Sequence, residues 1–401
     1  MRPLRVALLL LLAATLASAG VFFELRRRVI AFRDTPFGTG VEKVVEIPAG
    51  SVPRQVVRLL ARHGVLADET LAWRYVRWMK RDPRTMKAGE YGFTGPLRPD
   101  EVLERIYRGE VKTYQFTVPE GLRMEEIASI VEHAGLGHAS ELISLMRDPA
   151  FARELGVPFP NLEGYLFPDT YTFPRDPKPR AVLASMVARF REEYRKAEAD
   201  RLPSVTLDEK GAVTLASIVE KETGQPEERP RVSCVFHNRL ARRMRLQTDP
   251  TVMYATMLRR GGEWSRNITR DDLVAQHPYN TYAVTGLPPG PIASPGAAAL
   301  HAALHPAPCN DLFFVSRNDG THVFCPDLHC HEAAVRKWQV GFHRRRGTRP
   351  ATCGRQRQRS AEVSAAELGV SGAEPPMSKM AKPAARPAPK APPPGFHRQR
   401  R

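Results

Sequence analysis

Apolar positions divide the chain into an N-terminal run, a middle part of short elements and a C-terminal part with few large apolar residues. Residues 6–23 form an uncharged, mostly apolar run that reaches the lower end of the length a membrane-spanning helix needs. From about residue 213 to 338, helical and strand periods alternate between clear punctuation signals. From about residue 344, Arg, Pro and Ala dominate, and such a segment cannot bury a core. The pattern predicts an anchor, an α+β folded part and a disordered basic tail.

An internal repeat opens the folded part. Residues 47–50 (Ile-Pro-Ala-Gly) begin a segment with helically spaced apolar residues that closes at Gly64, and residues 118–121 (Val-Pro-Glu-Gly) begin another that closes at Gly135. Each copy is typical of a strand, a turn, an amphipathic helix and a C-capping glycine. Two interpretations remain open, namely two ordinary strand–helix units or two small α+β modules of the kind that grip extended polymers. The period alone supports only the first.

Helices and one hairpin are predicted in the rest of the folded part. Residues 213–221 have a helical pattern. Asp249 before Pro250 indicates an N-cap, and Thr269 with Asp272 indicates a capping box. The other expected elements are an apolar helical stripe at 232–240, a helix that starts at 294–295 and ends at 305–306, a hairpin of 312–316 and 321–325, and a last helix through 334–338.

The net charge of +17 is concentrated at the two ends of the chain. Residues 341–401 hold fourteen Lys and Arg against three acidic residues, and residues 1–28 hold five Arg against one Glu. The part between them is nearly neutral, whereas a nucleic-acid enzyme carries its basic stripe on the folded part. The distribution therefore argues against nucleic acid as a partner. At 401 residues the chain is long enough for two or more domains with cores.

The N-terminal run has two interpretations. Residues 17–19 (Ala-Ser-Ala) resemble a signal-peptidase site, but the apolar run continues past them through Phe23, which favours a retained membrane anchor over residues 1–28. Arginines flank the run on both sides, so the positive-inside rule alone does not decide its orientation.

Five cysteines are too few for a disulfide-built scaffold, and their odd number leaves at least one without an intrachain partner. A cluster of possible ligands invites a zinc interpretation: His322, Cys325, His329, Cys330 and His331. The spacing fits no standard zinc motif, and a local disulfide between Cys325 and Cys330 in an oxidising compartment is the simpler explanation. We expect no metal and no cofactor.

The strongest candidates for chemistry lie at the end of the predicted helix 213–221. Cleavage of a glycosidic bond needs a proton for the leaving oxygen, usually from a carboxylic acid that burial keeps neutral. Glu220 and Glu222 lie where an apolar wall could supply that burial. Most glutamates at helix ends are solvated, so the pattern alone is a weak indication.

The chain resembles the endolytic murein (peptidoglycan) transglycosylases, the YceG-like family, over about residues 44–338. Residues 216–223 (Ala-Ser-Ile-Val-Glu-Lys-Glu-Thr) are similar to the catalytic motif of that family. The other similar motifs are residues 87–91, 162–171, 235–240, 244–252, 279–282, 285–292 and 294–296. Motifs in this number and order are specific. The chain departs from the family at Glu332, where Asn is usual, and Cys325, Cys330 and the basic tail are additions.

The resemblance implies a non-hydrolytic reaction with Glu220 as the only catalytic residue. Glu220 would protonate the oxygen between N-acetylmuramic acid and N-acetylglucosamine. Its carboxylate would then take a proton from the muramyl C6 hydroxyl, which closes a 1,6-anhydro ring. One carboxylate serves both steps, so no second one is required.

The resemblance also implies an architecture and a place of action. We expect an α+β protein with an anchor at 1–28, a LysM-like module at 41–113, a catalytic region at 114–340 and a tail at 341–401. The folded part would lie outside the cytoplasmic membrane and cut nascent glycan strands, which limits their elongation. Peptidoglycan synthases are then expected partners.

Several polar residues of the motifs are candidates for substrate contact. Gln247 and Asn280 are favoured, whereas Asn238 and Tyr279 could equally satisfy loop backbone. Glu163 could line the site or brace a domain junction. Asp249 is better explained as a helix cap than as a second catalyst.

Two rival functions remain. A hydrolase of the same polymer would pair Glu220 with Asp249 or Glu222, and a non-catalytic glycan-binding scaffold would rely on the repeat.

Overall fold

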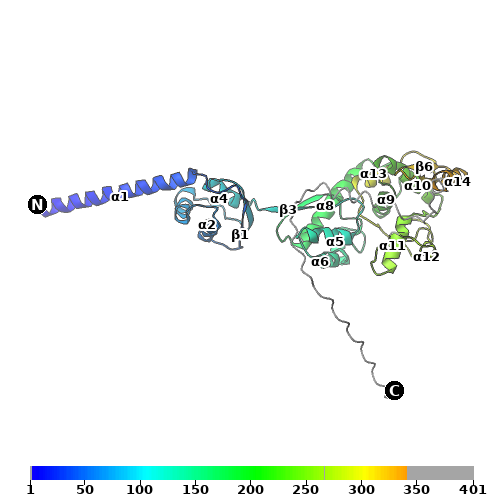
Figure 1. Ribbon diagram of the computed structural model, residues 1–401, viewed down its shortest axis with the longest axis horizontal. Helices are drawn as coiled ribbons and strands as arrows, with labels where there is room; N and C mark the ends of the chain where they lie inside the picture. The colour runs from blue at the N-terminus through cyan, green and yellow to red at the C-terminus, as the bar shows by residue number, and fades with distance from the viewer. Residues whose placement is uncertain (1, 266, 341–401) are drawn as a thin grey trace, which may run out of the picture. The chain divides into compact units, whose positions relative to one another are not determined.

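The computed structural model describes residues 2–265 and 267–340, so the tail predicted at 341–401 lies outside the described residues. Helix α1 (Arg2–Asp34) is unbroken, and its segment Ala7–Asp34 is long and apolar enough to cross a membrane (Figure 1). The helix extends past the predicted end of the anchor at residue 28. Val29 and Phe32 are only 1% and 8% exposed, because they belong to the apolar core of the next part of the chain.

The first copy of the repeat folds into a small module with its own core. Its elements are β1 (Lys43–Ile47), α2 (Pro53–Arg62), α3 (Glu69–Arg74), the π-helix η1 (Tyr75–Lys80), β2 (Gly89–Phe93) and α4 (Pro99–Arg108). Strands β1 and β2 pair antiparallel, with Val45 opposite Tyr91. The inward residues of the strands and of α2 and α4 form one apolar cluster with the end of α1.

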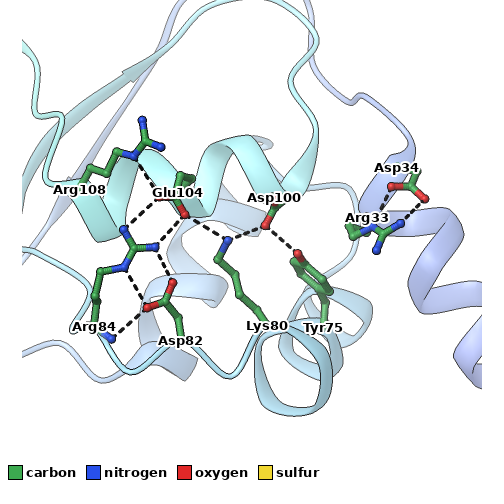
Figure 2. A network of polar contacts seen from close by, with 9 residues as sticks. All are labelled: Arg33, Asp34, Tyr75, Lys80, Asp82, Arg84, Asp100, Glu104 and Arg108. Carbon is green, nitrogen blue, oxygen red and sulfur yellow. Dashed lines mark hydrogen bonds and ion pairs between the residues drawn. The ribbon is translucent and has the colours of Figure 1, made fainter.

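A network of charged side chains ties η1 to α4 on the surface of this module (Figure 2). The Asp100 carboxylate accepts from the Tyr75 hydroxyl at 2.6 Å and from Lys80 Nζ at 2.5 Å. Arg84 bridges Asp82 and Glu104, with Nη2 at 2.6 and 2.9 Å from their carboxylate oxygens. The pairs are partly exposed, so each adds little stability and the apolar core holds the module together.

The second copy repeats this order of elements on a larger scale. Its elements are β3 (Thr113–Thr117), α5 (Met124–His133), α6 (Ala139–Met146), α7 (Pro149–Glu154), β4 (Thr170–Pro174) and α8 (Pro179–Ala199). Strands β3 and β4 pair antiparallel. Gly64 and Gly135, which follow α2 and α5, both have left-handed backbone conformations (φ +67° and +70°), so the predicted C-capping glycines are confirmed. The repeat is thus longer than its strand–helix signature indicated.

The remaining elements follow the second copy; those of residues 209–304 pack largely with it around one large apolar core, and those of residues 313–340 have a small apolar cluster of their own. They are α9 (Glu209–Glu222), the 3₁₀-helix η2 (Pro226–Glu228), α10 (Arg229–Ala241), α11 (Asp249–Arg259), α12 (Arg270–Val274), α13 (Ala297–Leu304), β5 (Phe313–Ser316), β6 (His322–Cys325), α14 (Leu328–Val335) and the π-helix η3 (Arg336–Val340). The predicted hairpin is confirmed as β5 and β6, and the mixed helix and strand content is that expected of an α+β protein.

Two predicted helix starts were wrong by a few residues. The helix expected at Ser294 begins at Ala297, because the backbone of Ser294 pairs with Gly121 and Leu122 and is therefore held outside the helix. The N-cap expected at Asp249 is Thr248, so Asp249 is the first helical residue. The capping box of Thr269 and Asp272 at the start of α12 is confirmed.

Candidate active site

Helix α9 carries Glu220 and is buried on every side. It starts after Asp208, whose carboxylate caps the helix by accepting from Gly211 N at 2.8 Å. All residues from Ala212 to Glu220 are buried, and the helix packs against α10, α11 and α13. A helix that is apolar all round belongs in a core. The acidic side chain of Glu220 therefore comes from one of the most deeply buried elements of the chain.

Glu220 is 9% exposed and both of its carboxylate oxygens accept hydrogen bonds. Oε1 accepts from Arg229 Nη2 at 2.7 Å, and Oε2 accepts from the backbone N–H of Gly296 at 3.1 Å. Burial raises the pKa of Glu220, whereas the guanidinium of Arg229 and the N–H of Gly296 oppose that rise because they stabilise the ionised form. Burial and the two donors thus act on Glu220 in opposite directions, and the net result is a raised pKa.

The turn between β3 and α5 brings a second carboxylate to this site. Arg229 Nη2 also donates to Glu120 Oε2, at 3.1 Å. Lys221, the residue after Glu220, donates from Nζ to Gly121 O at 2.8 Å, and Gly121 N donates to Ser294 O at 2.9 Å. The Pro-Glu-Gly turn of the second repeat copy is therefore fixed against the end of α9.

The loop that precedes α13 closes around the same helix end. Ile292 N donates to the hydroxyl of the buried Ser217, one turn before Glu220, at 3.1 Å. Gly164 packs directly against Pro291, since a β-carbon placed on Gly164 would lie 2.4 Å from Pro291 Cβ. Four motifs, at 162–171, 216–223, 285–292 and 294–296, therefore meet near Glu220.

Arg229 begins α10 directly after a residue that the β5–β6 hairpin holds in place. Glu228 accepts from His322 at two atoms, the backbone N at 2.9 Å and Nδ1 at 2.7 Å. His322 is the first residue of β6. The hairpin thus helps to fix the start of α10, from which Arg229 reaches Glu220.

Glu163 is buried in a pocket of tyrosines and backbone. Its carboxylate accepts from Met124 N at 3.2 Å and from the Tyr254 hydroxyl at 3.3 Å. Burial raises the pKa of Glu163 to about 8. The ring of Tyr279 packs at a tilt against that of Tyr254, with centroids 4.9 Å apart. Two predicted site residues, Glu163 and Tyr279, are therefore joined through Tyr254.

The side-chain amides of Asn280 and Asn238 donate hydrogen bonds to backbone carbonyls. Asn280 Nδ2 lies 2.8–3.1 Å from the carbonyl oxygens of Asp272, Leu273 and Ala275, and its side chain is fully buried. Asn238 Nδ2 donates to the carbonyls of Cys309 and Asp311 at 3.1 and 2.9 Å. Both contacts hold loops in place.

Gln247 differs from these residues because its side chain is exposed. Its backbone has a positive φ of 50°, and its N–H donates to Thr281 O at 3.2 Å. This bond joins the motif at 244–252 to the one at 279–282. The amide of Gln247 is the most accessible of the predicted substrate contacts.

Asp249 and Glu222, the predicted rivals for a second catalytic carboxylate, have other partners. Asp249 accepts from the Tyr282 hydroxyl at 2.8 Å. Glu222 accepts from the Thr248 hydroxyl, and burial raises the pKa of Glu222 to about 7. The carboxylate that shares a hydrogen-bond donor with Glu220 is that of Glu120.

Sequence reasoning missed Glu120, Arg229 and the N–H of Gly296. A signal for Glu120 was available: the first repeat copy has Ala49 at the matching position of the turn, so the fold of the turn does not require an acid. Arg229 carried no such signal, because it is one arginine among many in a basic chain.

The cysteines form two disulfides among the described residues. Cys325 pairs with Cys330, which confirms the local disulfide, and Cys234 pairs with Cys309, a pairing that the sequence did not indicate. Both sulfurs of the suspected zinc cluster are therefore in a covalent bond with each other. No group of His, Cys, Asp or Glu suited to a metal ion occurs within residues 2–265 and 267–340.

The site centres on Glu220, a buried acid at the end of a core helix with two hydrogen-bond donors on its carboxylate. A model of the YceG-like family matches residues 45–337, and the chain belongs to this family. An endolytic murein transglycosylase of Bacillus subtilis (strain 168) is 30% identical over 311 residues, which cover 73% of this chain and 84% of that protein.

Two further proteins are similar to this chain. An endolytic murein transglycosylase of Streptococcus pneumoniae serotype 2 (strain D39) is 26% identical over 303 residues, which cover 68% of this chain and 54% of that protein. A crystal structure of a yceG-like protein from Listeria monocytogenes aligns with a TM-score of 0.47 at 30% identity, over 73% of this chain and 98% of the other.

Proposed function

We propose that this protein is a membrane-bound lytic transglycosylase that cuts peptidoglycan glycan strands internally, between N-acetylmuramic acid and N-acetylglucosamine. Membership in the YceG-like family and the two relatives named endolytic murein transglycosylase support the class of enzyme. The observation that carries the proposal is the position of Glu220, buried at the end of a core helix with two donors on its carboxylate.

The chemistry needs a group that is first an acid and then a base. Protonated Glu220 gives its proton to the bridging oxygen as the bond from muramyl C1 to that oxygen breaks. The resulting carboxylate takes the proton of the C6 hydroxyl, and O6 bonds to C1 to form the 1,6-anhydro ring. The proton returns to Glu220 and no water is consumed. Burial favours the acid form, and Arg229 with the N–H of Gly296 stabilises the carboxylate left after the first step.

We assign the other predicted site residues to substrate contact or to holding the loops of the site in place. Gln247, with its exposed amide, is the proposed contact to sugar hydroxyl or N-acetyl groups. The bonds of Asn280 and Asn238 to backbone carbonyls support a role in shaping the loops of the site. Glu163 and Tyr279 would brace the site through Tyr254. The remaining candidate, Asp249, would fix the segment of Tyr282.

The proposed place of action is the outer side of the cytoplasmic membrane. Helix α1 suits a single-pass anchor by its length and composition. The two disulfides fit an oxidising compartment. Together they support a folded part that faces the periplasm or the cell exterior, where nascent strands are made. The first module, LysM-like in our proposal, would hold the strand, and peptidoglycan synthases would be the partners.

The test is product analysis with the full chain in detergent. Wild-type protein should convert glycan strands into fragments with 1,6-anhydro-muramyl ends, detected by mass spectrometry, and Glu220→Gln should abolish them. Glu222→Gln and Asp249→Asn are matched controls and should still release anhydro ends. Free reducing ends from the wild type would instead establish a hydrolase. Binding without cleavage by both wild type and Glu220→Gln would establish a scaffold.

A further inference from the structure

Arg229 holds two carboxylates with a single nitrogen. Its Nη2 lies 2.7 Å from Glu220 Oε1 and 3.1 Å from Glu120 Oε2. Arg229 and Glu220 have side chains only 7% and 5% exposed, whereas that of Glu120 is 44% exposed. One buried cation is thus shared between a buried acid and a more accessible one. Such a shared donor couples the two carboxylates electrostatically.

We propose that Glu120 is a positioning residue that acts through Arg229: by sharing its guanidinium, Glu120 keeps Glu220 able to hold the proton that the reaction consumes. This inference rests on the proposed function, because it assigns a role within the same site. Without Glu120, the charge of Arg229 would favour the carboxylate form of Glu220 more strongly, and the protonated form that gives the proton would be less populated. Without Arg229, the carboxylate formed in the first step would lack its partner. Glu120 and Arg229 therefore adjust one acid for two opposite tasks.

The charges that face Glu220 come from three segments. Arg229 of α10 and Lys221 of α9 lower the pKa of Glu220, and Glu120 of the β3–α5 turn raises it, in addition to the larger effect of burial. The residue before helix α13 contributes an uncharged group, the N–H of Gly296. Glu120 is thus the acidic residue that offsets the cations at this site.

Close packing and a neighbouring hydrogen bond fix the position of the Glu120 carboxylate. A β-carbon on Gly296 would lie 1.8 Å from Glu120 Oε1, so the carboxylate occupies space that only a glycine leaves open. Lys221 fixes the adjacent Gly121 through its carbonyl. The first repeat copy forms the same strand–turn–helix with Ala49 in place of this acid. The acid is therefore needed for something other than the turn.

The decisive variant is Glu120→Gln, which keeps the shape and an oxygen acceptor for Arg229 but removes the charge. Glycan cleavage is measured with the full chain in detergent across pH 4 to 9, with kcat and KM resolved. We expect the alkaline limb of kcat to move to lower pH, with roughly tenfold lower kcat near neutral pH, the factor that about one pH unit produces. Most of that loss should return at lower pH, and KM should change little.

Arg229 provides the opposite arm of the test. Arg229→Met should move the profile to higher pH, because the ionised form of Glu220 loses its cation. Thermal unfolding of each variant establishes that it folds. Arg229→Lys, which keeps the charge, should move the profile less than Arg229→Met, and if Arg229→Met proves unstable, Arg229→Lys is compared with the wild type alone. Glu198→Gln is the matched control: Glu198 is 37% exposed and pairs with Arg201 at 3.1 Å, and its variant should match the wild-type profile.

The inference and the proposed function fail in different ways. If Glu120→Gln shows the wild-type pH profile, a loss of kcat that is equal at every pH, or a change in KM alone, the inference is wrong while anhydro products still support the function. If the wild type yields free reducing ends, the function is wrong, and the pH profiles still report whether Glu120 adjusts Glu220.

Discussion

The two disulfides close loops of very different length, and this difference predicts their contributions to stability. Cys234 and Cys309 are 75 residues apart, whereas Cys325 and Cys330 are 5 apart. A cross-link restricts the unfolded chain by an amount that grows with the logarithm of loop length, which gives roughly 4 kcal/mol for the long loop and roughly 2 kcal/mol for the short one. We therefore expect loss of the Cys234–Cys309 bond to lower the free energy of unfolding about twice as much.

The assay is urea unfolding of the full chain in mild detergent, followed by tryptophan fluorescence. All variants carry Cys353→Ser, so that no third thiol can exchange with the disulfides. The double alanine variants of each pair are compared with the oxidised parent, and the reduced parent should show the sum of both losses. Equal losses for the two pairs, or no loss for the long-range pair, would refute the loop-length reasoning.

Three further predictions concern the supporting residues of the site. Glu163 holds its proton in the folded protein up to about pH 8 but ionises near 4.5 when unfolded, so its contribution to stability should fall as the pH rises between these values. Because burial also raises the pKa of Glu222 to about 7, Glu163→Gln should flatten the slope in urea titrations mainly between about pH 7 and 8, and an unchanged slope there would assign it to another group. Gly164→Ala should lower stability by about 1–3 kcal/mol in thermal unfolding, because the new methyl meets Pro291. Gly261→Ala is the control: the site has φ +71° and open space, so this variant should lose only the stability that the strained backbone conformation costs. Asn280→Ala removes the two amide N–H groups that three backbone carbonyls share and should cost about 1–3 kcal/mol of stability; a raised KM at unchanged stability would instead mark a substrate contact.

The sequence predicted those parts of the fold that depend on local patterns. Helix α9 has an apolar period and the hairpin β5–β6 has strand alternation around Asn318-Asp319-Gly320, so both were predicted close to their observed bounds. The repeat was predicted from its Pro-X-Gly turns and helical stripes. The pairing of β3 with β4 was not, since three helices and a long loop separate the strands in the sequence.

The site required information that local patterns do not hold. Glu220 was identified because its motif is contiguous. Gly296, which donates to its carboxylate, lies 76 residues later, and Glu120, which shares Arg229 with it, lies about a hundred residues earlier. The bond between Cys234 and Cys309 likewise depends on the packing of α10 against the loop after α13. Such contacts are set by tertiary packing, so a single sequence gives residue types but not which of them meet.

Helix α1 has a practical consequence for how this protein is produced. Val29 and Phe32 fill the interior of the first module, so a soluble fragment that starts after Asp34 would expose the surface they cover and leave two vacancies in a small core. A fragment that starts just after the apolar run, near Glu24, keeps both side chains. Truncations made at the end of the helix would therefore measure a damaged module rather than the effect of removing the membrane anchor.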